Sequence, residues 1–326
     1  MVGDEHRIAI GTYPTPVDRL ETLGLWVKRD DLVAPRYGGN KVRKLEHLLG
    51  EAKALGKKRI VTLGAAGSHQ IVATALYGTE LGFEVDAVLV SQPASEHARN
   101  NLRVALALGA HPFVAPAWAA APAVLASRLG RDTYVVPLGG SNALGSLGFF
   151  EAAIELSAQI KAGLLPEPEL VVVALGSGGT AAGLAVGFER EGLKTKIVGV
   201  VVSPPVRLVR ALTKHLAKKT AELVGLSRGA RVRSAERIEV DGRWVGKGYG
   251  YSTHESTAAI GIASEVGLEL DPTYTAKAFA CALARVRENA GPVLYWHTLS
   301  TAPLDAWLEA APPLPPRLEA LLRRPP

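Results

Sequence analysis

Residues 170–180 read Leu170-Val171-Val172-Val173-Ala174-Leu175-Gly176-Ser177-Gly178-Gly179-Thr180, and this stretch decides the fold class. An apolar run without a polar residue is typical of a strand buried on both faces, as in a parallel sheet covered by helices. The small residues that follow open a helical pattern that ends at Glu191. The stretch therefore predicts a strand, a sharp turn and a helix whose N-terminal N–H groups can surround an anion.

The same alternation of apolar runs and helical patterns extends along the chain. We expect strands at 59–63, 83–90, 134–138, 170–175, 197–203 and 293–297, and helices at 70–81, 95–108, 145–164, 179–191 and 206–223. This order predicts an α/β protein of two domains, each with a mainly parallel sheet flanked by helices.

Glycine-rich turns near Arg43 and at 139–145 mark two domain crossings. We therefore predict a large domain made of 1–43 plus 146–326 and a small inserted α/β domain at 44–145. The proline-rich tail from Ala311 is expected to pack loosely on the surface.

Composition narrows the class of protein. The chain has 326 residues, of which 48% are hydrophobic and 21% charged, and no apolar run approaches the ~18 residues of a membrane span. Residues 1–7 are charged and no apolar segment follows, so we expect no signal peptide. Cys281 is the single cysteine, which excludes an intrachain disulfide and predicts an inert core thiol. A cytoplasmic location fits these features best.

The net charge of +6 is spread along the chain without a basic stripe interleaved with aromatic residues. This distribution argues against nucleic-acid binding and favours anionic small molecules. We expect no metal site and no membrane partner.

The glycine loop at 176–180 has the composition of a monophosphate site. A nucleotide P-loop ends in Gly-Lys-Ser/Thr, and no lysine is present here. A dinucleotide-binding loop needs a third glycine at position 181, which is Ala181, and an acidic residue at the end of the next strand, which 197–203 lacks. A tight strand-to-helix turn without a ligand remains the simpler alternative.

Lys41 follows the turn formers Gly38, Gly39 and Asn40. A lysine that reacts with an aldehyde must be neutral, so burial or a nearby cation such as Arg43 or Lys44 must lower its pKa. Spacing alone favours an ordinary surface lysine. Together with the later phosphate loop, however, the lysine suggests pyridoxal 5'-phosphate, an aldehyde cofactor that carries a phosphate.

Seven motifs in order resemble those of a known family. They are Lys28-Arg29-Asp30-Asp31-Leu32, Gly39-Asn40-Lys41 with Arg43-Lys44-Leu45-Glu46, Gly139 to Gly145, Gly176 to Thr180, Gly248-Tyr249-Gly250 and Asp271 to Ala278, followed by His297-Thr298. The chain resembles D-cysteine desulfhydrases and 1-aminocyclopropane-1-carboxylate deaminases, which are fold type II (tryptophan synthase β-like) pyridoxal-phosphate enzymes. The resemblance spans most of the chain. It implies that the cofactor lies in a cleft between the domains and that the protein is a homodimer.

The resemblance also implies roles for matching residues. Lys41 would hold the cofactor and move the α-proton of an amino-acid substrate, and Lys44 would lie near the phosphate. Thr298 matches the residue beside the pyridine nitrogen. The phosphate would be bound by the loop residues Gly176, Ser177, Gly178, Gly179 and Thr180.

Substrate contacts are implied at two further places. Ser68 matches a serine near the substrate carboxylate that assists proton transfer, and its small-residue loop before a helix supports anion binding independently. His69 and Gln70 follow it and are assigned to the substrate site, and His69 also to the cofactor. Tyr274 and Tyr249 match two active-site tyrosines, which protonate a leaving group if their pKa is lowered. A plain helix cap at Ser68 and core tyrosines are the alternatives.

Two positions separate the branches of the family. Deaminases have Glu after the tyrosine equivalent to Tyr274 and Leu at the end of the last strand, whereas desulfhydrases have a small hydroxyl residue and Thr. This chain has Thr275 and Thr298, so both positions indicate a desulfhydrase. We assign Thr275 to the substrate site.

Two departures from the family pattern concern the substrate. His69 replaces an Asn beside the cofactor's phenolic oxygen, and a histidine there can still donate a hydrogen bond. Leu299-Ser300 replaces two glycines, which is expected to narrow the space near the pyridine ring or to shift the backbone.

The sequence thus predicts elimination from a β-substituted amino acid, with D-cysteine yielding pyruvate, ammonia and hydrogen sulfide. The alternatives are deamination of 1-aminocyclopropane-1-carboxylate to 2-oxobutanoate and ammonia, a catalytically weak pyridoxal-phosphate-binding protein, and an NAD- or ATP-binding α/β protein.

Overall fold

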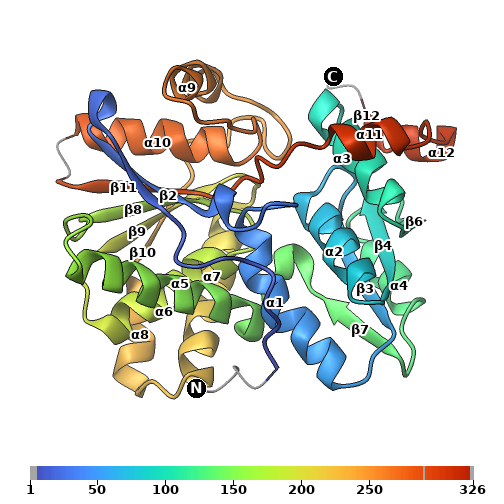
Figure 1. The fold of residues 1–326 in the computed structure, drawn as a ribbon, viewed down its shortest axis with the longest axis horizontal. Helices are drawn as coiled ribbons and strands as arrows, with labels where there is room; N and C mark the ends of the chain where they lie inside the picture. Colours follow the sequence, from blue (N-terminus) through green and yellow to red (C-terminus); the bar gives the residue numbers. More distant parts are fainter. Residues whose placement is uncertain (1–5, 289–290, 324–326) are drawn as a thin grey trace. The chain divides into compact units, whose positions relative to one another are not determined.

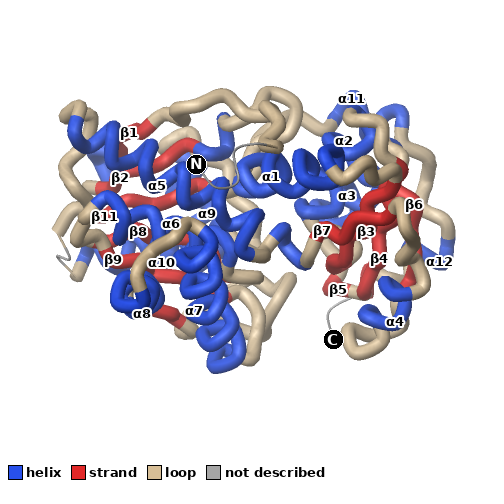
Figure 2. The backbone as a smooth tube through the Cα atoms, turned by 90° about the horizontal axis from the view of Figure 1, so that it is seen from below, coloured by secondary structure: helices blue, strands red, loops and turns tan. Residues whose placement is uncertain are grey.

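The structure is a computed structural model that describes residues 6–288 and 291–323. Contacts within the chain divide it into two compact units. Unit 1 comprises Gly11–Lys44 and Ser141–Ala302, and unit 2 comprises His6–Ile10, Leu45–Gly140 and the chain from Pro303 onward. Each unit contains its own parallel sheet covered by helices, as Figures 1 and 2 show. The predicted fold class is therefore confirmed.

Unit 1 is built on a six-stranded sheet in the order β1-β2-β11-β8-β9-β10. Only β1 pairs antiparallel with its neighbour, and all other pairs in this sheet are parallel. Its strands are β1 (Val17–Leu20), β2 (Leu25–Arg29), β8 (Leu170–Leu175), β9 (Lys196–Val201), β10 (Ile238–Asp241) and β11 (Val293–His297). The ends of β8 and β11 are those that the apolar runs predict.

Helices cover both faces of this sheet. They are α5 (Ala143–Lys161), α6 (Gly179–Glu191), α7 (Val206–Leu223), α8 (Arg228–Glu236), α9 (His254–Glu265) and α10 (Thr275–Arg287), with short 3-10 helices η1 (Glu21–Leu23) and η2 (Asp30–Leu32). Alternate residues of β8 enter different cores. Val171 and Val173 pack with α5 and α6, whereas Leu170 and Val172 pack with α9 and α10. This two-sided burial explains the unbroken apolar run of β8.

Glycines allow α5 and α6 to approach closely. A Cβ on Gly183 would lie 2.2 Å from the Ser146 carbonyl oxygen, and one on Gly187 would lie 2.4 Å from Ala153 Cβ. No real Cβ tolerates such distances, so the two helices depend on residues without side chains here. The close contact holds α6, which opens with the phosphate loop, against α5.

Unit 2 contains a four-stranded parallel sheet in the order β6-β4-β3-β7. Its strands are β3 (Arg59–Ala65), β4 (Glu84–Val90), β6 (Ala110–Val114) and β7 (Thr133–Val136), and a two-stranded ribbon joins β5 (Gln92–Pro93) to β12 (Leu322–Arg323). Its helices are α2 (His69–Glu80), α3 (Glu96–Ala107), α4 (Ala121–Ala126), η3 (Leu138–Gly140), α11 (Asp305–Ala310) and α12 (Pro316–Glu319). Helix α1 (Asn40–Ala54) starts in unit 1 and continues in unit 2.

The C-terminal tail differs from the prediction. We placed 303–326 in the large domain and expected a loose tail, but its described part belongs to unit 2. Leu318, Leu321 and Leu322 are buried, and the Arg103 guanidinium donates hydrogen bonds to two tail carbonyls. Three leucines and the pairing of β12 with β5 therefore hold the tail against unit 2, although its proline content suggested loose packing. The domain division at 44 and 145 itself remains a prediction.

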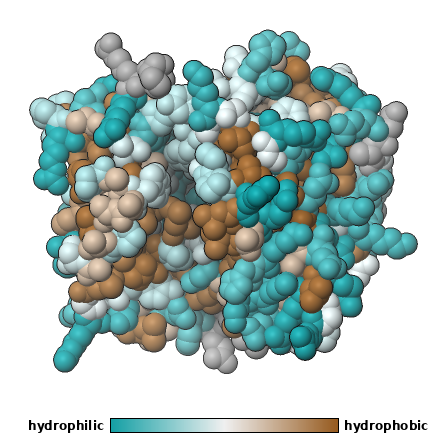
Figure 3. Space-filling model, turned by 180° about the vertical axis from the view of Figure 1, so that it is seen from behind, coloured by the Kyte–Doolittle hydropathy of each residue, from teal (hydrophilic) through white to brown (hydrophobic). Residues whose placement is uncertain are grey.

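The surface carries a mixture of apolar and hydrophilic residues that is usual for a globular protein. On the face drawn in Figure 3, apolar residues (brown) lie among hydrophilic ones (teal), as on most globular proteins. Within the described ranges, no helix combines the length and the apolarity that crossing a bilayer requires. Cys281 is fully buried in α10, as predicted.

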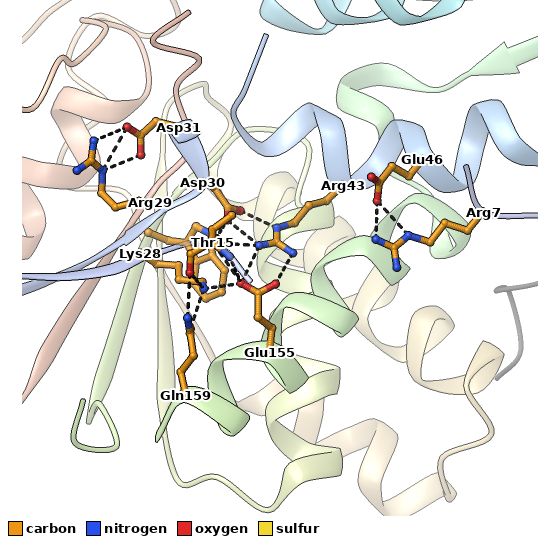
Figure 4. A network of polar contacts seen from close by, with 11 residues as sticks. Arg7, Thr15, Lys28, Arg29, Asp30, Asp31, Arg43, Glu46, Glu155 and Gln159 are labelled. Carbon is orange, nitrogen blue, oxygen red and sulfur yellow. Dashed lines mark hydrogen bonds and ion pairs between the residues drawn. The ribbon is translucent and has the colours of Figure 1, made fainter. Parts of the chain in front are cut away.

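A buried cluster of charges, formed by Lys28, Asp30, Arg43 and Glu155, includes a residue of the first turn of α1 (Figure 4). Asp30, which is 0% exposed, accepts two hydrogen bonds from the Arg43 guanidinium, one from the Trp296 indole at 2.8 Å and one from the Thr15 hydroxyl at 2.9 Å. Glu155 of α5 accepts further bonds from Arg43. The cluster therefore ties β2, α1, α5 and β11 together.

Lys28 completes this cluster. Its amine contacts Glu155 at 2.5 Å and also donates to Gln159 and to the Thr15 carbonyl. Burial opposes ionisation of Asp30, but the neighbouring Arg43 and Lys28 charges hold the pKa of this carboxyl below its usual value. Burial lowers the pKa of Lys28, although the carboxylates of Glu155 and Asp30 oppose this shift, and each charge in the cluster has an opposite neighbour.

We expect Asp30→Asn to lower the free energy of unfolding by roughly 3–5 kcal/mol, because Arg43 and Lys28 would lose a buried counter-charge. The contribution of Asp30 is present above the ordinary aspartate pKa near ~4 and is lost as the pH falls through its lowered pKa. The deficit should therefore shrink in acid. Urea unfolding from pH 3 to 7 measures it.

Asp18→Asn serves as the matched control, because Asp18 is a partly exposed residue paired with Arg29. It should change the free energy of unfolding by less than ~1 kcal/mol. Equal effects of the two substitutions would show that the cluster carries no special stability.

Candidate active site

The glycine loop forms an anion-binding turn at the end of β8. Gly178 adopts φ 91°, a left-handed conformation that favours glycine, and α6 begins at Gly179. A Cβ on Gly178 would also lie 2.6 Å from the Thr213 hydroxyl oxygen. Both the left-handed φ and the close approach to Thr213 therefore require glycine at position 178. The N–H groups of the α6 N-terminus lie at this loop.

Lys44 and two serines meet this loop. The Lys44 amine donates to Ser141 Oγ at 3.1 Å, and Ser141 Oγ lies 2.7 Å from Ser177 Oγ. The Gly179 N–H also donates to Ser141 Oγ at 3.2 Å. A Cβ on Gly179 would lie only 3.1 Å from the Lys44 amine. One lysine amine, two hydroxyls and a helix N-terminus thus converge on one place.

Lys44 is 1% exposed, and burial together with the charge of Lys41 lowers its pKa well below the usual value. A dianionic phosphate beside the amine would restore the charged form, because an opposite charge favours ionisation. The residues present therefore fit the phosphate group of pyridoxal phosphate. Ser141 was not predicted as a site residue, although it belongs to the quoted motif 139–145.

Lys41 follows a turn that only glycines can form. A Cβ on Gly39, which has φ 79°, would lie 2.6 Å from the Thr298 carbonyl oxygen. The same carbonyl accepts the Asn40 N–H at 3.2 Å, and the Asn40 amide donates to Thr180 Oγ1 at 3.3 Å. The turn therefore fixes Lys41 against the end of β11 and ties it to the phosphate loop.

Burial lowers the pKa of Lys41 to about 8, although the carboxylate of Asp271 opposes this shift. Of the two expected causes, burial and a neighbouring cation, burial is the one found, and the Arg43 guanidinium is engaged by Asp30 and Glu155. With this pKa, roughly a tenth of Lys41 is neutral at pH 7. The amine is therefore available as a nucleophile for an aldehyde.

The two predicted tyrosines form a pair. Tyr274 donates a hydrogen bond from its hydroxyl to that of Tyr249 at 2.8 Å, and their rings meet edge to face. Gly176 brings the loop to Tyr274, because a Cβ there would lie 3.6 Å from the ring. Burial raises the pKa of Tyr249 to about 12 and that of Tyr274 well above its usual value. The lowering of tyrosine pKa that proton donation was expected to need is therefore not found, and both phenols stay protonated.

Asp271 is a buried carboxylate that the sequence reasoning missed. It accepts the backbone N–H groups of Thr273, Tyr274 and Thr275 and the Thr275 hydroxyl, the last at 2.6 Å. Its charge also acts on the pKa of Lys41. The quoted Asp271-Pro272 motif was the available signal, since an Asp before a helix is a common cap.

Lys277 was missed too. Its amine is fully buried and donates to the Val245 carbonyl at 2.9 Å and to the Gly248 carbonyl at 3.1 Å. These bonds hold the loop that carries Tyr249. Burial lowers the pKa of Lys277 to about 8.

The departure at Leu299-Ser300 has a structural role. Ser300 Oγ accepts the N–H of Gly38 at 2.9 Å, so the hydroxyl supports the turn before Lys41. Leu299 is buried, and its carbonyl lies against Gly39. A glycine at position 300 could not make this side-chain contact.

Ser68, His69 and Gln70 lie together in unit 2, at the start of α2. Ser68 Oγ accepts the Gln70 N–H at 3.2 Å, so the helix-cap geometry is present. The Gln70 side chain is buried and donates to Thr74 Oγ1. That this group and the Lys41 group of unit 1 bind one substrate remains a prediction.

We expect inorganic phosphate to raise the melting temperature of the cofactor-free protein, and Lys44→Met to abolish most of this rise. In phosphate-free buffer the lowered pKa of Lys44 makes the folded state take up fewer protons than the unfolded one. This cost grows as the pH falls below the unfolded lysine pKa of ~10.4, so Lys44→Met should be no less stable than wild type at pH 7. Thermal unfolding with and without phosphate measures both effects.

Lys53→Met, an exposed lysine on the same helix, is the matched control and should keep the full response to phosphate. An unchanged response in Lys44→Met would place the anion elsewhere.

Known proteins of similar sequence and structure point to the same cofactor. A model of the family described as pyridoxal-phosphate dependent enzyme matches residues 8–298. D-cysteine desulfhydrase from Klebsiella pneumoniae (strain 342) is 33% identical over 92% of this chain and 96% of its own length. Nocardicin C-9' epimerase from Nocardia uniformis subsp. tsuyamanensis is 33% identical over 96% and 97%.

A crystal structure described as an ACC deaminase homologue has a TM-score of 0.78 and 29% identity, and covers 95% of this chain and 97% of that one. Family match, relatives and lysine-phosphate site agree on the cofactor. The chain therefore belongs to the family of pyridoxal-phosphate-dependent enzymes.

Proposed function

We propose that this enzyme catalyses α,β-elimination from a β-substituted amino acid, with D-cysteine as the preferred substrate. The products would be pyruvate, ammonia and hydrogen sulfide. The observation that carries the proposal is the Lys41 amine, whose pKa is about 8, held in one unit with the phosphate loop. Relatives named D-cysteine desulfhydrase support the substrate.

Pyridoxal phosphate, when bound, supplies the electron sink that stabilises a negative charge at the α-carbon of an amino acid. Lys41 would hold it, Lys44 with Ser177, Gly178, Gly179 and Thr180 would bind its phosphate, and Thr298 would lie at its ring. Lys41 then receives the α-proton at its Nζ atom, for which a pKa near neutrality is suited.

The tyrosine pair would assist the departing thiolate. Since burial keeps both phenols protonated, Tyr249 and Tyr274 act as hydrogen-bond donors and not as bases. Tyr274 donates to Tyr249, which leaves the Tyr249 O–H to donate to the leaving sulfur. A hydrogen bond to a developing thiolate stabilises it without full proton transfer.

The α2 N-terminus would bind the substrate carboxylate. Ser68 and the backbone N–H groups of His69 and Gln70 form a helix start, where a negative charge is stabilised. The proposal assigns this group of unit 2 and the Lys41 group of unit 1 to the same substrate. It also includes a homodimer, which the family resemblance implies, and a cytoplasmic location, which the composition and the single cysteine favour.

The decisive experiment combines a spectrum with product detection. The purified protein should show a near-violet absorption band that Lys41→Ala abolishes, and added D-cysteine should release sulfide and pyruvate in equal amounts. Arg99→Ala, which removes an exposed arginine paired with Glu319, should leave band and activity unchanged. A band without sulfide or pyruvate would reject the substrate, and absence of a band after cofactor addition would reject the reaction.

Epimerisation is the second candidate, because a relative of equal identity is named nocardicin C-9' epimerase. It needs the same α-proton removal without loss of a β-substituent. Turnover in deuterium oxide separates the two reactions. Deuterium at the α-carbon of recovered, inverted amino acid without pyruvate would favour the epimerase.

The positions Thr275 and Thr298 provide a test of the deaminase alternative. We expect the double exchange Thr275→Glu and Thr298→Leu to lower D-cysteine turnover at least tenfold and to raise 2-oxobutanoate release from 1-aminocyclopropane-1-carboxylate. The Thr275 hydroxyl bonds to Asp271, so a carboxylate at 275 would add negative charge beside the cofactor ring.

The control for this exchange is Thr275→Ser with Thr298→Ser, which keeps both hydroxyls and should keep the desulfhydrase activity. Loss of D-cysteine turnover without any gain of 2-oxobutanoate, in a protein that retains the absorption band, would show that these positions do not decide the reaction.

A further inference from the structure

A chain of polar contacts in unit 2 ends at His69. The Asn101 amide nitrogen lies 3.0 Å from the Gly67 carbonyl oxygen and 3.3 Å from His97 Nε2. His97 Nε2 in turn lies 2.8 Å from His69 Nε2, and the two imidazole rings are tilted by 45°. His69 is one of the two places at which this chain departs from the family pattern.

The orientation of the Asn101 amide is fixed by its partner. A backbone carbonyl oxygen only accepts hydrogen bonds, so the Asn101 atom that faces the Gly67 carbonyl must be the NH2 group. Asn101 is 0% exposed, so water does not compete for this contact. Gly67 is held from its other side as well, because its N–H donates to Gln92 Oε1 at 2.9 Å.

Gly67 also sets the distance between the loop and α3. A Cβ at this position would lie 2.5 Å from both Cα and Cβ of Ala98, so the first turn of α3 lies directly against the glycine. This close approach brings His97 and Asn101, which are one helical turn apart, to the start of α2. The geometry of the pair is therefore built into the backbone.

The Asn101 amide indicates which ring nitrogen of His97 and of His69 carries a hydrogen. The Asn101 NH2 group can only donate and lies 3.3 Å from His97 Nε2, so this nitrogen presents its single lone pair, which the Asn101 amide and the His69 ring share. The short contact of 2.8 Å then requires the hydrogen to reside on His69 Nε2. A neutral imidazole carries only one N–H, so His69 Nδ1 is an acceptor.

We propose that His97, fixed by Asn101, is a positioning residue that makes His69 a proton acceptor at Nδ1 in the substrate site. A neutral His69 then cannot donate from Nδ1, in contrast to the donor role expected at this position. An acceptor suits the ammonium group of an amino acid, which must lose a proton before its nitrogen can react. The arrangement of the rings stands by itself, and only its contact with a substrate rests on the proposed function.

Nuclear magnetic resonance of the full chain with its cofactor tests the arrangement. In protein labelled with 15N at histidine, we expect a ring proton with a one-bond coupling to His69 Nε2 and a 15N–15N coupling from that atom to His97 Nε2. His69→Asn and His97→Gln assign the signals. A proton bonded to His97 Nε2, or absence of the coupling between the rings, would overturn the proposal.

Kinetics test the role. His97→Phe removes the acceptor and should lower kcat on the order of tenfold, whereas His97→Gln keeps an acceptor oxygen and should retain most of the rate. The double variant of His69→Asn with His97→Phe should be no slower than His69→Asn alone, because His97 acts through His69. His215→Phe, at an exposed histidine of α7, should not change the rate.

Additive losses in the double variant would show that His97 is only structural and would overturn the positioning role. If the wild type turns over no β-substituted amino acid, the proposed function fails, and the ring couplings still decide the proton arrangement. The two failures are therefore distinguishable.

Discussion

The ion cluster of Asp30, Arg43, Lys28 and Glu155 is the constraint on which the cofactor site depends. Arg43 lies two residues after Lys41 and one before Lys44, and its guanidinium is held by Asp30 and Glu155. The first turn of α1 can therefore neither rotate nor slide without breaking buried charge pairs. The cluster also draws on β2, α5 and β11, so the reactive lysine is fixed by three elements distant in sequence.

Within this frame, burial determines the chemistry of the amines. Lys41 and Lys44 are one helical turn apart on α1, and burial lowers the pKa of both. The two could not both be charged without a counter-ion. The carboxylate of Asp271 favours the charge of Lys41, and a phosphate would do the same for Lys44. The site is therefore poised to accept an anion and an aldehyde together.

The sequence was sufficient for the parts of the fold that follow from periodicity. The strand at 170–175 and the helices at 179–191 and 206–223 are found with the predicted ends, because long apolar runs and strong helical patterns determine them. Short elements such as β1, β6 and β10 lack such a signal, and tertiary pairing makes them strands. The anchoring of the tail by Leu318, Leu321 and Leu322 was missed, because its proline content drew attention away from these leucines.

The sequence predicted some residues of the site but not others. Lys41, Lys44 and the glycine loop were found because their motifs are local, and the structure links them through Asn40, Ser141 and Ser177. Asp271 had a local signal in its Asp-Pro motif, whereas Lys277 and His97 could not be found from sequence alone, because their importance comes from burial and from partners far along the chain. The sequence also could not predict that the pKa of Tyr249 and Tyr274 is raised, because the burial of these side chains causes the shift.

The low pKa of Lys41 has a consequence for chemical reactivity. Amine-selective acylating reagents attack only neutral amines, and exposed lysines are almost entirely charged at pH 8. Half-buried Lys41, with a pKa of about 8, is about half neutral there. In the cofactor-free protein it is therefore set apart from the exposed lysines as a site for selective covalent labelling.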